Sequence, residues 1–566
     1  METLLSPRSL LLPPELSEAI RGSSLGFKSV SLSPEQLADL ELLLSGALFP
    51  LTGYLPQEDF ESCLDRLRLH DGTPWALPIS LDISAEMAAL LQPGDKLALR
   101  DGEGFMLAVL TVESVFPADV FAVARSIFGQ EQPANHPGAA AYVRRTKSYR
   151  VGGPVEGLSL PLHCDFTELR RPPAKMRELV AERNWTKVLG CLAPPFPTFQ
   201  DKAEFLDAAL CLNSSILLLH PVGDAMAQGA EHFASVRCVS HFAAGFPPSM
   251  MGFGLLPYYG IGAGPRQALH EALILKNFGC THMLVGAHHG DPDGECTEAP
   301  CYARGEAQRL VERFADETGI AMTPRQEMVY VEGKAHYMAR SSVSADDSVQ
   351  TLAPAAVRHR LEFDLSLPDW YTLPEIEDDL RQAFPPRSRQ GITLFMTGLS
   401  GAGKSTLARH LYVKLMELRT RPVTLLDGDI VRRRLSSELT FSKAHRNLNI
   451  ERIAFVASEI TKNGGIAVCA PIAPYASSRA TAREMVSTYG GFIEIYVATP
   501  LEVCEQRDRK GLYAKARSGL LKGVTGIDDP YEAPASAEIV LDTTKRAPGE
   551  CVQEVLLYLK QQGYLA

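Results

Sequence analysis

The spacing of hydrophobic residues changes along this chain and predicts four parts. Residues 1–160 contain a leucine-rich helical stretch and then short alternating segments between turn residues, which is typical of a β-rich domain. Residues 161–325 alternate between helical patterns and short apolar runs, which predicts an α/β domain with a parallel sheet. A small linking segment, 326–387, and a second α/β domain, 388–566, complete the predicted organisation.

Local signals define some of the elements. Ser33 suits a helix N-cap, Pro34 the first helical position, and Gln36 a capping box. Within the first α/β part, the apolar runs 215–219 and 282–286 predict two strands of the parallel sheet.

The last part opens with Pro385 and Pro386, which cannot continue a helix and therefore predict a linker. Residues 391–397 are then apolar and β-branched enough for a buried parallel strand, and three leucines from residue 407 recur at helical spacing. Between strand and helix lies a run that fits the P-loop pattern. The run is Gly398, Leu399, Ser400, Gly401, Ala402, Gly403, Lys404, Ser405 and Thr406.

This run has the chemistry of ATP binding. Its backbone N–H groups and the following helix N-terminus can surround phosphates, while Lys404 reaches the β/γ oxygens and Ser405 ligates Mg²⁺. A second apolar strand, 423–426, leads into Asp427 and Asp429 at its carboxyl end, the edge where ligands bind in open parallel sheets. We expect Asp427 to hold Mg²⁺ or its waters. Asp429 is expected to accept the proton when a substrate hydroxyl attacks the γ-phosphorus, so Lys404 and Asp429 are the predicted catalytic residues.

Composition narrows the class of protein. The chain has 566 residues, 45% of them apolar, and a formal net charge of -11, which argues against general binding to nucleic acid or membranes. The cysteines are scattered, and the N-terminus has an early Glu2 and Pro7 where a secretion signal has a basic, then apolar, run. No apolar run reaches the roughly 18 residues of a membrane span. We expect a cytoplasmic enzyme.

Further motifs occur along nearly the whole chain. They lie in front at 39–43, 50–54, 136–138, 152–154, 165–170, 263–266 and 277–282, and in the last part at 427–429, 446–449, 510–513 and 525–532. Together with the P-loop they resemble the bifunctional enzymes of sulfate activation, which join ATP sulfurylase to adenosine 5′-phosphosulfate (APS) kinase. The resemblance implies a PUA-like β-rich domain, a sulfurylase-like nucleotidyltransferase domain, a small linker domain and a C-terminal P-loop kinase, assembled as a homo-oligomer.

The resemblance also implies that the last part transfers the ATP γ-phosphate to the 3′-hydroxyl of APS, giving 3′-phospho-APS (PAPS). Phe441 can stack on adenine, and arginines can bind the phosphosulfate with planar donors, although a solvated helix face is the alternative for any one arginine. Arg479 is a further candidate. The residues expected to bind APS are Asp429, Arg432, Phe441, Arg446, Asn449, Ile472, Ala473, Lys510, Val524 and Thr525.

Residues 507–517 are rich in cations and contain a glycine, which suits a lid over the nucleotide phosphates; a charged surface helix is the alternative. Three positions depart from many kinase relatives. Ala473 replaces a serine, which excludes a phosphoserine there and leaves direct in-line transfer. His445 replaces an acid, and Val524 replaces an aromatic residue that often completes the adenine sandwich.

The sulfurylase-like part departs more strongly. Active sulfurylases carry Gln-x-Arg-Asn-Pro and then two histidines, which bind sulfate and ATP phosphates. Here the glutamine, arginine, asparagine and histidines are replaced by Leu192, Pro194, Pro195, Thr198 and Asp201. Adenylyl transfer needs cations that offset charge in the transition state. We therefore expect this part to keep the sulfurylase fold without its activity.

Other positions of the sulfurylase-like part support the same expectation or suggest different sites. Gly260-Ile261 replaces a usual Met-Arg, and Ala287-His288 replaces a usual Arg-Asp. His220 and Arg266 could belong to a vestigial nucleotide pocket, although core or surface roles explain them equally well. His288, His289, Cys296 and Cys301 suggest a zinc site, but their spacing is irregular and favours ordinary histidines and reduced cysteines.

Three functions remain open. The first and favoured is an APS kinase whose front half is structural or regulatory. The second is a fully bifunctional ATP sulfurylase and APS kinase, which would need cations from elsewhere. The third makes the last part a non-catalytic sensor of PAPS, as in fungal sulfurylases. The intact Lys404, Ser405, Asp427 and Asp429 argue against the third.

Overall fold

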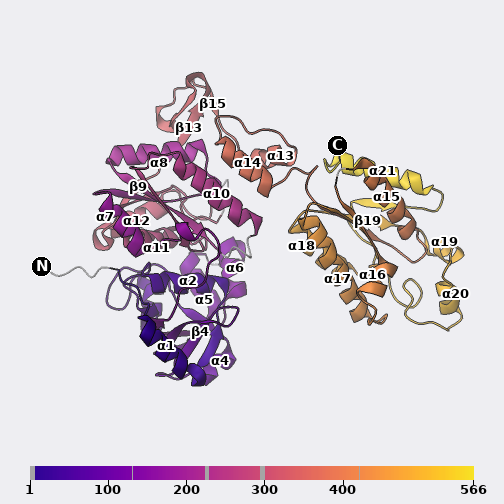
Figure 1. Cartoon of the computed structure of the whole chain (residues 1–566), viewed down its shortest axis with the longest axis horizontal. Helices are drawn as coiled ribbons and strands as arrows, with labels where there is room; N and C mark the ends of the chain where they lie inside the picture. The colour runs from indigo at the N-terminus through magenta and orange to yellow at the C-terminus, as the bar shows by residue number, and fades with distance from the viewer. Residues whose placement is uncertain (1–6, 131, 224–228, 293–299, 420, 566) are drawn as a thin grey trace. The chain divides into compact units, whose positions relative to one another are not determined.

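The computed structural model describes residues 7–130, 132–223, 229–292, 300–419 and 421–565. These residues form two compact units (Figure 1). One unit comprises the chain up to residue 352 together with 368–383, and the other comprises 353–367 together with the chain from 384. The chain therefore passes between the units at residues 352–353, 367–368 and 383–384. No helix among the described residues is long and apolar enough to cross a membrane.

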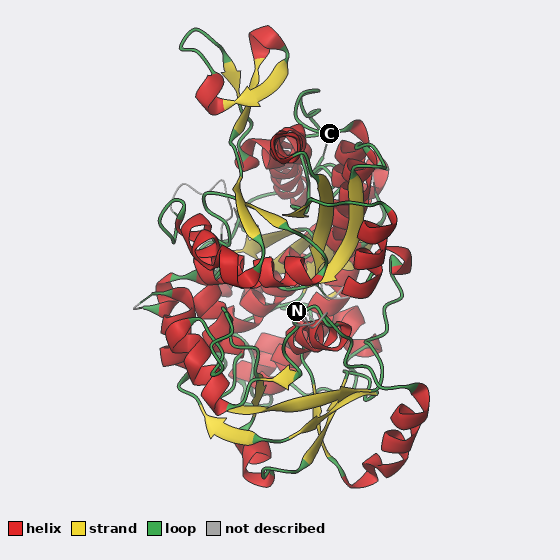
Figure 2. Cartoon of the chain, turned by 90° about the vertical axis from the view of Figure 1, so that its left-hand side faces the viewer, coloured by secondary structure: helices red, strands yellow, loops and turns green. Residues whose placement is uncertain are grey.

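The first unit begins with the predicted β-rich domain, whose strands lie at the bottom of the view in Figure 2. The strand order is β1-β4-β5-β7-β2, with β3 and β6 also paired to β7, and β1 with β4 is a parallel pair. The strands are β1 (Lys28–Ser31), β2 (Gly53–Tyr54), β3 (Leu81–Ile83), β4 (Lys96–Arg100), β5 (Met106–Thr111), β6 (Ser114–Pro117) and β7 (Tyr149–Gly157). The helices are α1 (Pro14–Ser23), α2 (Pro34–Ser45), α3 (Gln57–Arg66), α4 (Ala85–Leu90), α5 (Val120–Phe128) and α6 (Pro137–Arg145).

Helix α2 follows from its local sequence. The Ser33 hydroxyl accepts a hydrogen bond from the Gln36 N–H, and the Gln36 side chain accepts one from the Ser33 N–H at 2.9 Å. With Pro34 at the start, this confirms the predicted capping box. The helix ends at Gly46, whose φ of +81° is one that glycine adopts without steric cost.

The α/β domain of the first unit is built on a parallel sheet in the order β10-β9-β8-β11-β12. The predicted strands at 215–219 and 282–286 are confirmed as β9 and β11. The strands are β8 (Val188–Leu192), β9 (Ser215–Val222), β10 (Met251–Pro257), β11 (His282–Val285) and β12 (Ala321–Pro324). The helices are α7 (Pro173–Glu182), α8 (Phe199–Leu212), α10 (Ala230–Ala244), α11 (Gly264–Asn277) and α12 (Glu306–Thr318).

The segment between the two α/β domains is divided between the units. A small antiparallel sheet of β13 (Met328–Val331), β14 (His336–Ala339) and β15 (Val349–Gln350) and the helix α14 (Pro374–Ala383) belong to the first unit. Helix α13 (Pro354–Glu362) belongs to the second. There Arg387 Nη2 lies 3.1 Å from Glu362 Oε2, and the Arg387 guanidinium lies 5.5 Å from the centre of the Phe363 ring.

The second unit contains the predicted P-loop domain, a parallel sheet in the order β17-β18-β16-β19-β20. The strands are β16 (Ile392–Thr397), β17 (Val423–Asp427), β18 (Ile466–Ala470), β19 (Gly491–Val497) and β20 (Ile539–Leu541). The helices are α15 (Lys404–Leu418), α16 (Gly428–Arg434), α17 (Lys443–Lys462), α18 (Ala476–Ser487), α19 (Leu501–Gln506), α20 (Leu512–Arg517) and α21 (Pro548–Gln561).

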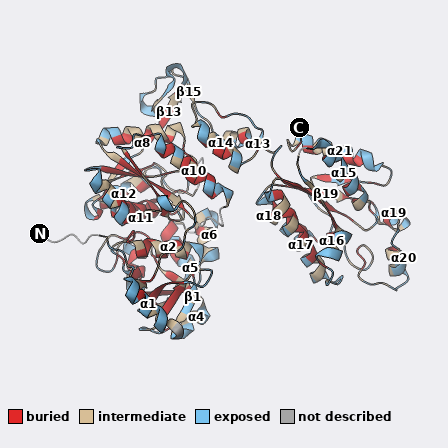
Figure 3. Cartoon of the chain, in the orientation of Figure 1, coloured by how far each residue is buried: buried red, intermediate tan, exposed pale blue. Residues whose placement is uncertain are grey.

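Strand β16 lies at the centre of this sheet, and all of its residues are buried. The neighbouring β19 is labelled in Figure 3 and is also largely buried. Ile392, Leu394 and Met396 pack with α15 and α21, whereas Phe395 packs with α17 and α18. This alternation follows from the two-residue period of a strand. The core therefore fixes the end of β16, and with it the loop that follows.

Candidate active site

The loop after β16 has the geometry of a P-loop between strand and helix. Gly398, Gly401 and Gly403 have φ values of +149°, +77° and +102°, and α15 begins directly after Gly403. A Cβ atom on Gly398 would lie 2.6 Å from the Val497 carbonyl oxygen, and one on Gly401 would lie 2.9 Å from the Cys504 carbonyl oxygen. Only glycine fits both positions, so the predicted strand, loop and helix are confirmed.

Side chains distant in sequence hold this loop. Thr499 and Thr543 donate hydrogen bonds to the Ala402 carbonyl at 3.1 and 2.9 Å. The Tyr513 hydroxyl, on the predicted lid, donates to the Ser400 carbonyl at 2.8 Å. Sequence reasoning missed the two threonines and placed Tyr513 only within the lid. The signal that could have found them is that each threonine follows the apolar run of a strand, β19 or β20, so both lie at the sheet edge that carries the P-loop.

Lys404 is buried beneath the loop. Its ammonium group donates hydrogen bonds to the carbonyls of Gly398 and Leu399, both at 2.8 Å. Burial lowers the pKa of Lys404 to about 8, with a further lowering by the Lys510 charge and opposing contributions from Asp429 and Asp427. The predicted lysine and the two predicted carboxylates therefore act on one another electrostatically.

Nucleotide binding should weaken as the pH rises through about 8, the pKa of Lys404 in the ligand-free protein. Phosphate oxygens stabilise the charged ammonium, so binding raises this pKa, and above pH 8 the lysine must take up a proton when ATP binds. The Kd for ATP should then rise by up to about tenfold per pH unit. Calorimetric titrations at about pH 9, in buffers of different ionisation enthalpy, measure the uptake. The control is Lys414→Met, which replaces an exposed lysine of the same helix and should show the same proton uptake as the wild type. Absence of proton uptake in both proteins would contradict the assignment of this pKa to Lys404.

The two aspartates after β17 differ in environment. Asp427 is 4% exposed, and its Oδ1 accepts a hydrogen bond from the Asp429 N–H at 3.0 Å. Asp429 is exposed and forms an ion pair with Lys510. Hydroxyl and carboxylate oxygens are ligands that Mg²⁺ prefers, so Ser405 and Asp427 fit the predicted metal ligands chemically.

The arginines expected to bind APS are engaged with neighbouring groups. Arg432 lies 4.0 Å from the centre of the exposed Phe441 ring and donates to the Leu439 carbonyl at 3.3 Å. Arg446 donates to Thr525 Oγ1 at 2.6 Å and to Asp529 Oδ2 at 2.7 Å. The pKa of Arg432 is lowered, first by burial and then by the positive charge of Arg446. The structure thus brings these predicted residues together.

Asn449 lies one turn after Arg446 on α17 and is 7% exposed. Its Oδ1 atom is buried and accepts no hydrogen bond from the residues that the structure describes. A buried polar atom of this kind usually has a partner, so this oxygen is suited to accept a hydrogen bond from a ligand. Ile472, Ala473 and Val524 are held in the loops after β18 and before β20.

His445 anchors the loop before α17. Its Nδ1 atom accepts a hydrogen bond from the Thr440 N–H at 2.9 Å. The bond ties the start of α17 to the segment that carries Phe441.

Arg479 is placed differently from the other arginines. It is 4% exposed, lies 2.8 Å from Glu494 Oε1 through its Nε, and donates to the carbonyls of Ala473 and Glu532 at 2.9 and 2.8 Å. Its donors are therefore directed at the protein, and this arrangement does not support direct binding of phosphosulfate by Arg479.

In the sulfurylase-like domain, the segment after β8 contains no cation between residues 192 and 201. Thr198 and Asp201 cap α8 reciprocally, with the Thr198 N–H donating to Asp201 Oδ2 at 2.7 Å. The neighbouring Arg325 is paired with Asp201 at 2.6 Å and with Glu204. This arginine is thus held by carboxylates where a sulfate site would need free positive charge.

The other candidates of this domain have structural partners. Arg266 donates to the carbonyls of Leu64, Cys63 and Ala76 at 2.6, 3.2 and 3.3 Å. His220 is 2% exposed, and burial lowers its pKa to about 4, so it is neutral at pH 7.

The zinc site suggested by the sequence is only partly within the described residues. His289 Nε2 lies 2.5 Å from Glu271 Oε2, while Cys296 falls in 293–299, outside the described residues. Among the residues that are described, no group of three or more His, Cys, Asp or Glu side chains could hold a metal ion.

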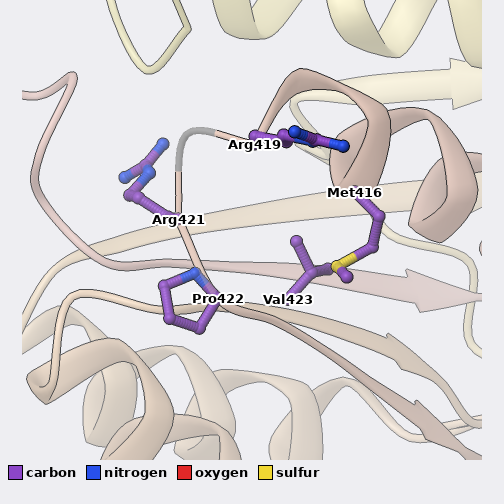
Figure 4. Close-up of a pocket in the computed structure, with 5 residues that line it drawn as sticks. All are labelled: Met416, Arg419, Arg421, Pro422 and Val423. Carbon is purple, nitrogen blue, oxygen red and sulfur yellow. The ribbon is translucent and has the colours of Figure 1, made fainter.

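A shallow hollow on the second unit lies away from the P-loop of the same unit (Figure 4). It is lined by Met416, Arg419, Arg421, Pro422 and Val423. Val423 begins β17, whereas Asp427 ends it, so the hollow lies at the end of the sheet opposite to the P-loop. Arg421 donates to the Tyr564 carbonyl at 2.6 Å, which gives it a structural role.

Comparison with known proteins places the whole chain. Family models described as PUA-like domain, ATP-sulfurylase and Adenylylsulphate kinase match residues 8–160, 167–383 and 390–542. The sulfate adenylyltransferase of Mycosarcoma maydis is 38% identical over 543 residues, which cover 95% of this chain and 94% of that protein. The chain belongs to the sulfate adenylyltransferase family. The predicted order of a PUA-like domain, a sulfurylase domain and a P-loop kinase domain is confirmed.

Two further relatives differ in their names. The sulfate adenylyltransferase of Phaeosphaeria nodorum is 39% identical over 542 residues, or 95% of this chain and 94% of that protein. A solved structure, named "Hexameric APS kinase from Thiobacillus denitrificans", has a TM-score of 0.82 and 36% identity, and covers 100% of both chains. The family model and the solved structure both support a kinase domain in this chain. The names of the curated relatives favour the bifunctional alternative over loss of the sulfurylase activity.

Proposed function

We propose that this chain is an APS kinase, which transfers the γ-phosphate of ATP to the 3′-hydroxyl of APS and gives PAPS and ADP. The observation that carries the proposal is the complete phosphate site. Gly398, Gly401 and Gly403 shape the loop, Lys404 lies beneath it, and Asp427 and Asp429 follow the neighbouring strand. In this proposal these residues would supply the phosphate-binding, metal-binding and base functions that phosphoryl transfer requires of the protein.

In this proposal the protein contributes positioning and charge. The P-loop N–H groups and Lys404 would bind the β- and γ-phosphates, and Ser405 and Asp427 would hold Mg²⁺, which offsets phosphate charge when bound. Asp429 would accept the proton of the 3′-hydroxyl. Since Lys510 pairs with Asp429 in this structure, the lysine must leave the carboxylate, or turn to the substrate, before the base can act.

The same site weighs against a purely regulatory kinase domain. An effector site needs binding groups but no general base, whereas Asp429 is retained in a position where its charge acts on Lys404. The retained base therefore favours turnover over sensing of PAPS.

Adenylyl transfer by the front half is the second candidate, because relatives that cover 95% of this chain are named sulfate adenylyltransferases. The residues of this chain weigh against it. Pro194 and Pro195 lack backbone donors, and Arg325 is paired with two acids. The full-length Thiobacillus denitrificans relative is named only for the kinase. We infer that the sulfurylase-like half is structural or regulatory.

One purified protein can decide between these functions. ADP formation from ATP and APS measures the kinase reaction, and ATP formation from APS and pyrophosphate measures the sulfurylase reaction in reverse. We expect the first activity and not the second. ATP formation from pyrophosphate would establish the bifunctional enzyme, and absence of both would favour the sensor.

We also propose a homo-oligomer, since the Thiobacillus denitrificans relative of equal coverage is described as hexameric. Light scattering on the full-length protein should give a mass that is a multiple of 61.8 kDa. A monomeric mass over the whole concentration range would contradict this proposal.

A further inference from the structure

The P-loop contains a four-residue turn whose central peptide has a defined orientation. The Ala402 N–H donates a hydrogen bond to the Leu399 carbonyl at 3.2 Å and closes this turn, and Gly401, its third residue, has a φ of +77°. A positive φ at the third position distinguishes a type II turn from a type I turn, and the two types differ by a rotation of the central peptide. One of the two orientations of the peptide between Ser400 and Gly401 is therefore selected in this structure.

A buried tyrosine holds this peptide by its carbonyl. The Tyr513 hydroxyl donates a hydrogen bond to the Ser400 carbonyl oxygen at 2.8 Å. Tyr513 is 2% exposed and packs in the same hydrophobic cluster as Ala402 and Cys504. Burial raises the pKa of Tyr513, so at neutral pH the hydroxyl keeps the proton that it donates. The Ser400 carbonyl is thus directed at the core of the second unit.

Tyr513 is suited to this role because its own backbone is fixed. It lies in the first turn of α20, where the Asp508 carboxylate accepts hydrogen bonds from three consecutive N–H groups. The donors are Leu512, Tyr513 and Ala514, at 2.8, 2.9 and 3.0 Å. These bonds fix the start of α20, so the predicted lid is joined to the P-loop across 113 positions of sequence.

The held carbonyl determines where the N–H group of the same peptide points. In a trans peptide the C=O and N–H bonds point in opposite directions. Since the Ser400 carbonyl faces the core, the Gly401 N–H points away from the core. No backbone carbonyl among the residues that the structure describes accepts a hydrogen bond from it. Backbone N–H groups of a P-loop surround phosphate oxygens, and this donor is available to one of them.

We propose that Tyr513 is a positioning residue for ATP: by holding the Ser400 carbonyl, its hydroxyl turns the Gly401 N–H toward the nucleotide phosphates. The inference rests on ATP binding by the P-loop, which is part of the proposed kinase function. Tyr513 acts through the loop and does not touch the nucleotide. Loss of its hydroxyl should therefore weaken the binding of the phosphates and leave the binding of the nucleoside as it is.

Removal of the Tyr513 hydroxyl tests the inference in the absence of APS. Tyr513→Phe keeps the ring in the core and should raise the Kd for ATP by about fivefold to tenfold, the effect of one oriented hydrogen bond. The Kd for adenosine, which carries no phosphate, should be unchanged. Both constants are obtained by calorimetric titration, with adenosine in competition with ATP. Thermal unfolding verifies that the variant is folded.

Tyr475→Phe is the matched control. Tyr475 is also 2% exposed, and its hydroxyl donates a hydrogen bond at the same distance of 2.8 Å, but to Asp529 Oδ1 and not to the P-loop. The control therefore loses a hydroxyl of equal burial in the same unit. Its Kd for ATP should equal that of the wild type.

Three outcomes would overturn the inference. They are an unchanged Kd for ATP in folded Tyr513→Phe, an equal rise in the Kd for adenosine, and an equal rise in the Kd for ATP in Tyr475→Phe. Failure of the proposed function is recognised separately. If the wild type binds ATP but does not phosphorylate APS, the kinase function falls, and the Kd of Tyr513→Phe for ATP still decides the role of Tyr513. A wild type that binds no ATP would overturn both.

Discussion

Lys404→Met should abolish APS phosphorylation while leaving the fold intact. We expect kcat/KM to fall by about 10³-fold. The substitution removes the positive charge beneath the P-loop, which can stabilise the phosphoryl group during its transfer. The reaction is followed by ADP formation, and the fold by circular dichroism and thermal unfolding.

The stability of this variant is informative in itself. Burial lowers the pKa of Lys404 to about 8, which means that the folded state disfavours its charge. Replacing the lysine by an uncharged residue of similar length should therefore not lower the Tm at pH 7. Lys414→Met is the control for a lysine of the same helix, since Lys414 is exposed and paired only with Glu417 among the ion pairs of the described residues. Turnover within tenfold of wild type in a folded Lys404→Met would refute the assignment.

Asp429→Asn should lower kcat by about 10²- to 10⁴-fold, the usual contribution of a general base, and leave the KM for ATP near its wild-type value. The amide has the same size but cannot accept the proton of the 3′-hydroxyl. Asp429 does not cap α16, since that role belongs to Asp427, so the helix should be unaffected. Initial rates at saturating and limiting ATP separate the two parameters.

Glu438→Gln provides the comparison for Asp429→Asn. Glu438 is an exposed acid near the same site, paired with Arg452 at 2.6 Å, and its neutralisation should leave kcat unchanged. If both variants lost activity equally, the effect would be one of surface charge. If neither did, Asp429 would not be the base.

The parts of the site that could be predicted are those encoded by neighbouring residues. The apolar run before Gly398, the leucines after Lys404 and the position of Asp427 at a strand end all lie within short windows, and parallel topology brings them to one edge. The capping box of α2 is predictable for the same reason. Each signal is local, so a single sequence suffices to locate it.

The parts that could not be predicted depend on contacts between distant residues. Arg446 meets Asp529 across 83 positions of sequence, and Arg479 meets Glu532 across 53. A sequence shows that these residues are arginines, but not whether their donors face solvent, substrate or backbone carbonyls. For this reason sequence reasoning groups Arg479 with the substrate-binding arginines and misses its contact with Ala473.

The way in which residues 353–383 are shared between the two compact units limits how the protein can be taken apart. Helix α13 precedes α14 in sequence but belongs to the second unit, whereas α14 belongs to the first unit. A fragment that starts at residue 384 would lack α13, whose neighbour Phe363 packs beside Arg387. A fragment that starts at residue 353 would include α14 but lack the rest of the first unit, to which α14 belongs. No single cut therefore yields two complete halves, and exchange of the second unit between relatives would require three junctions, two before α14 and one after it.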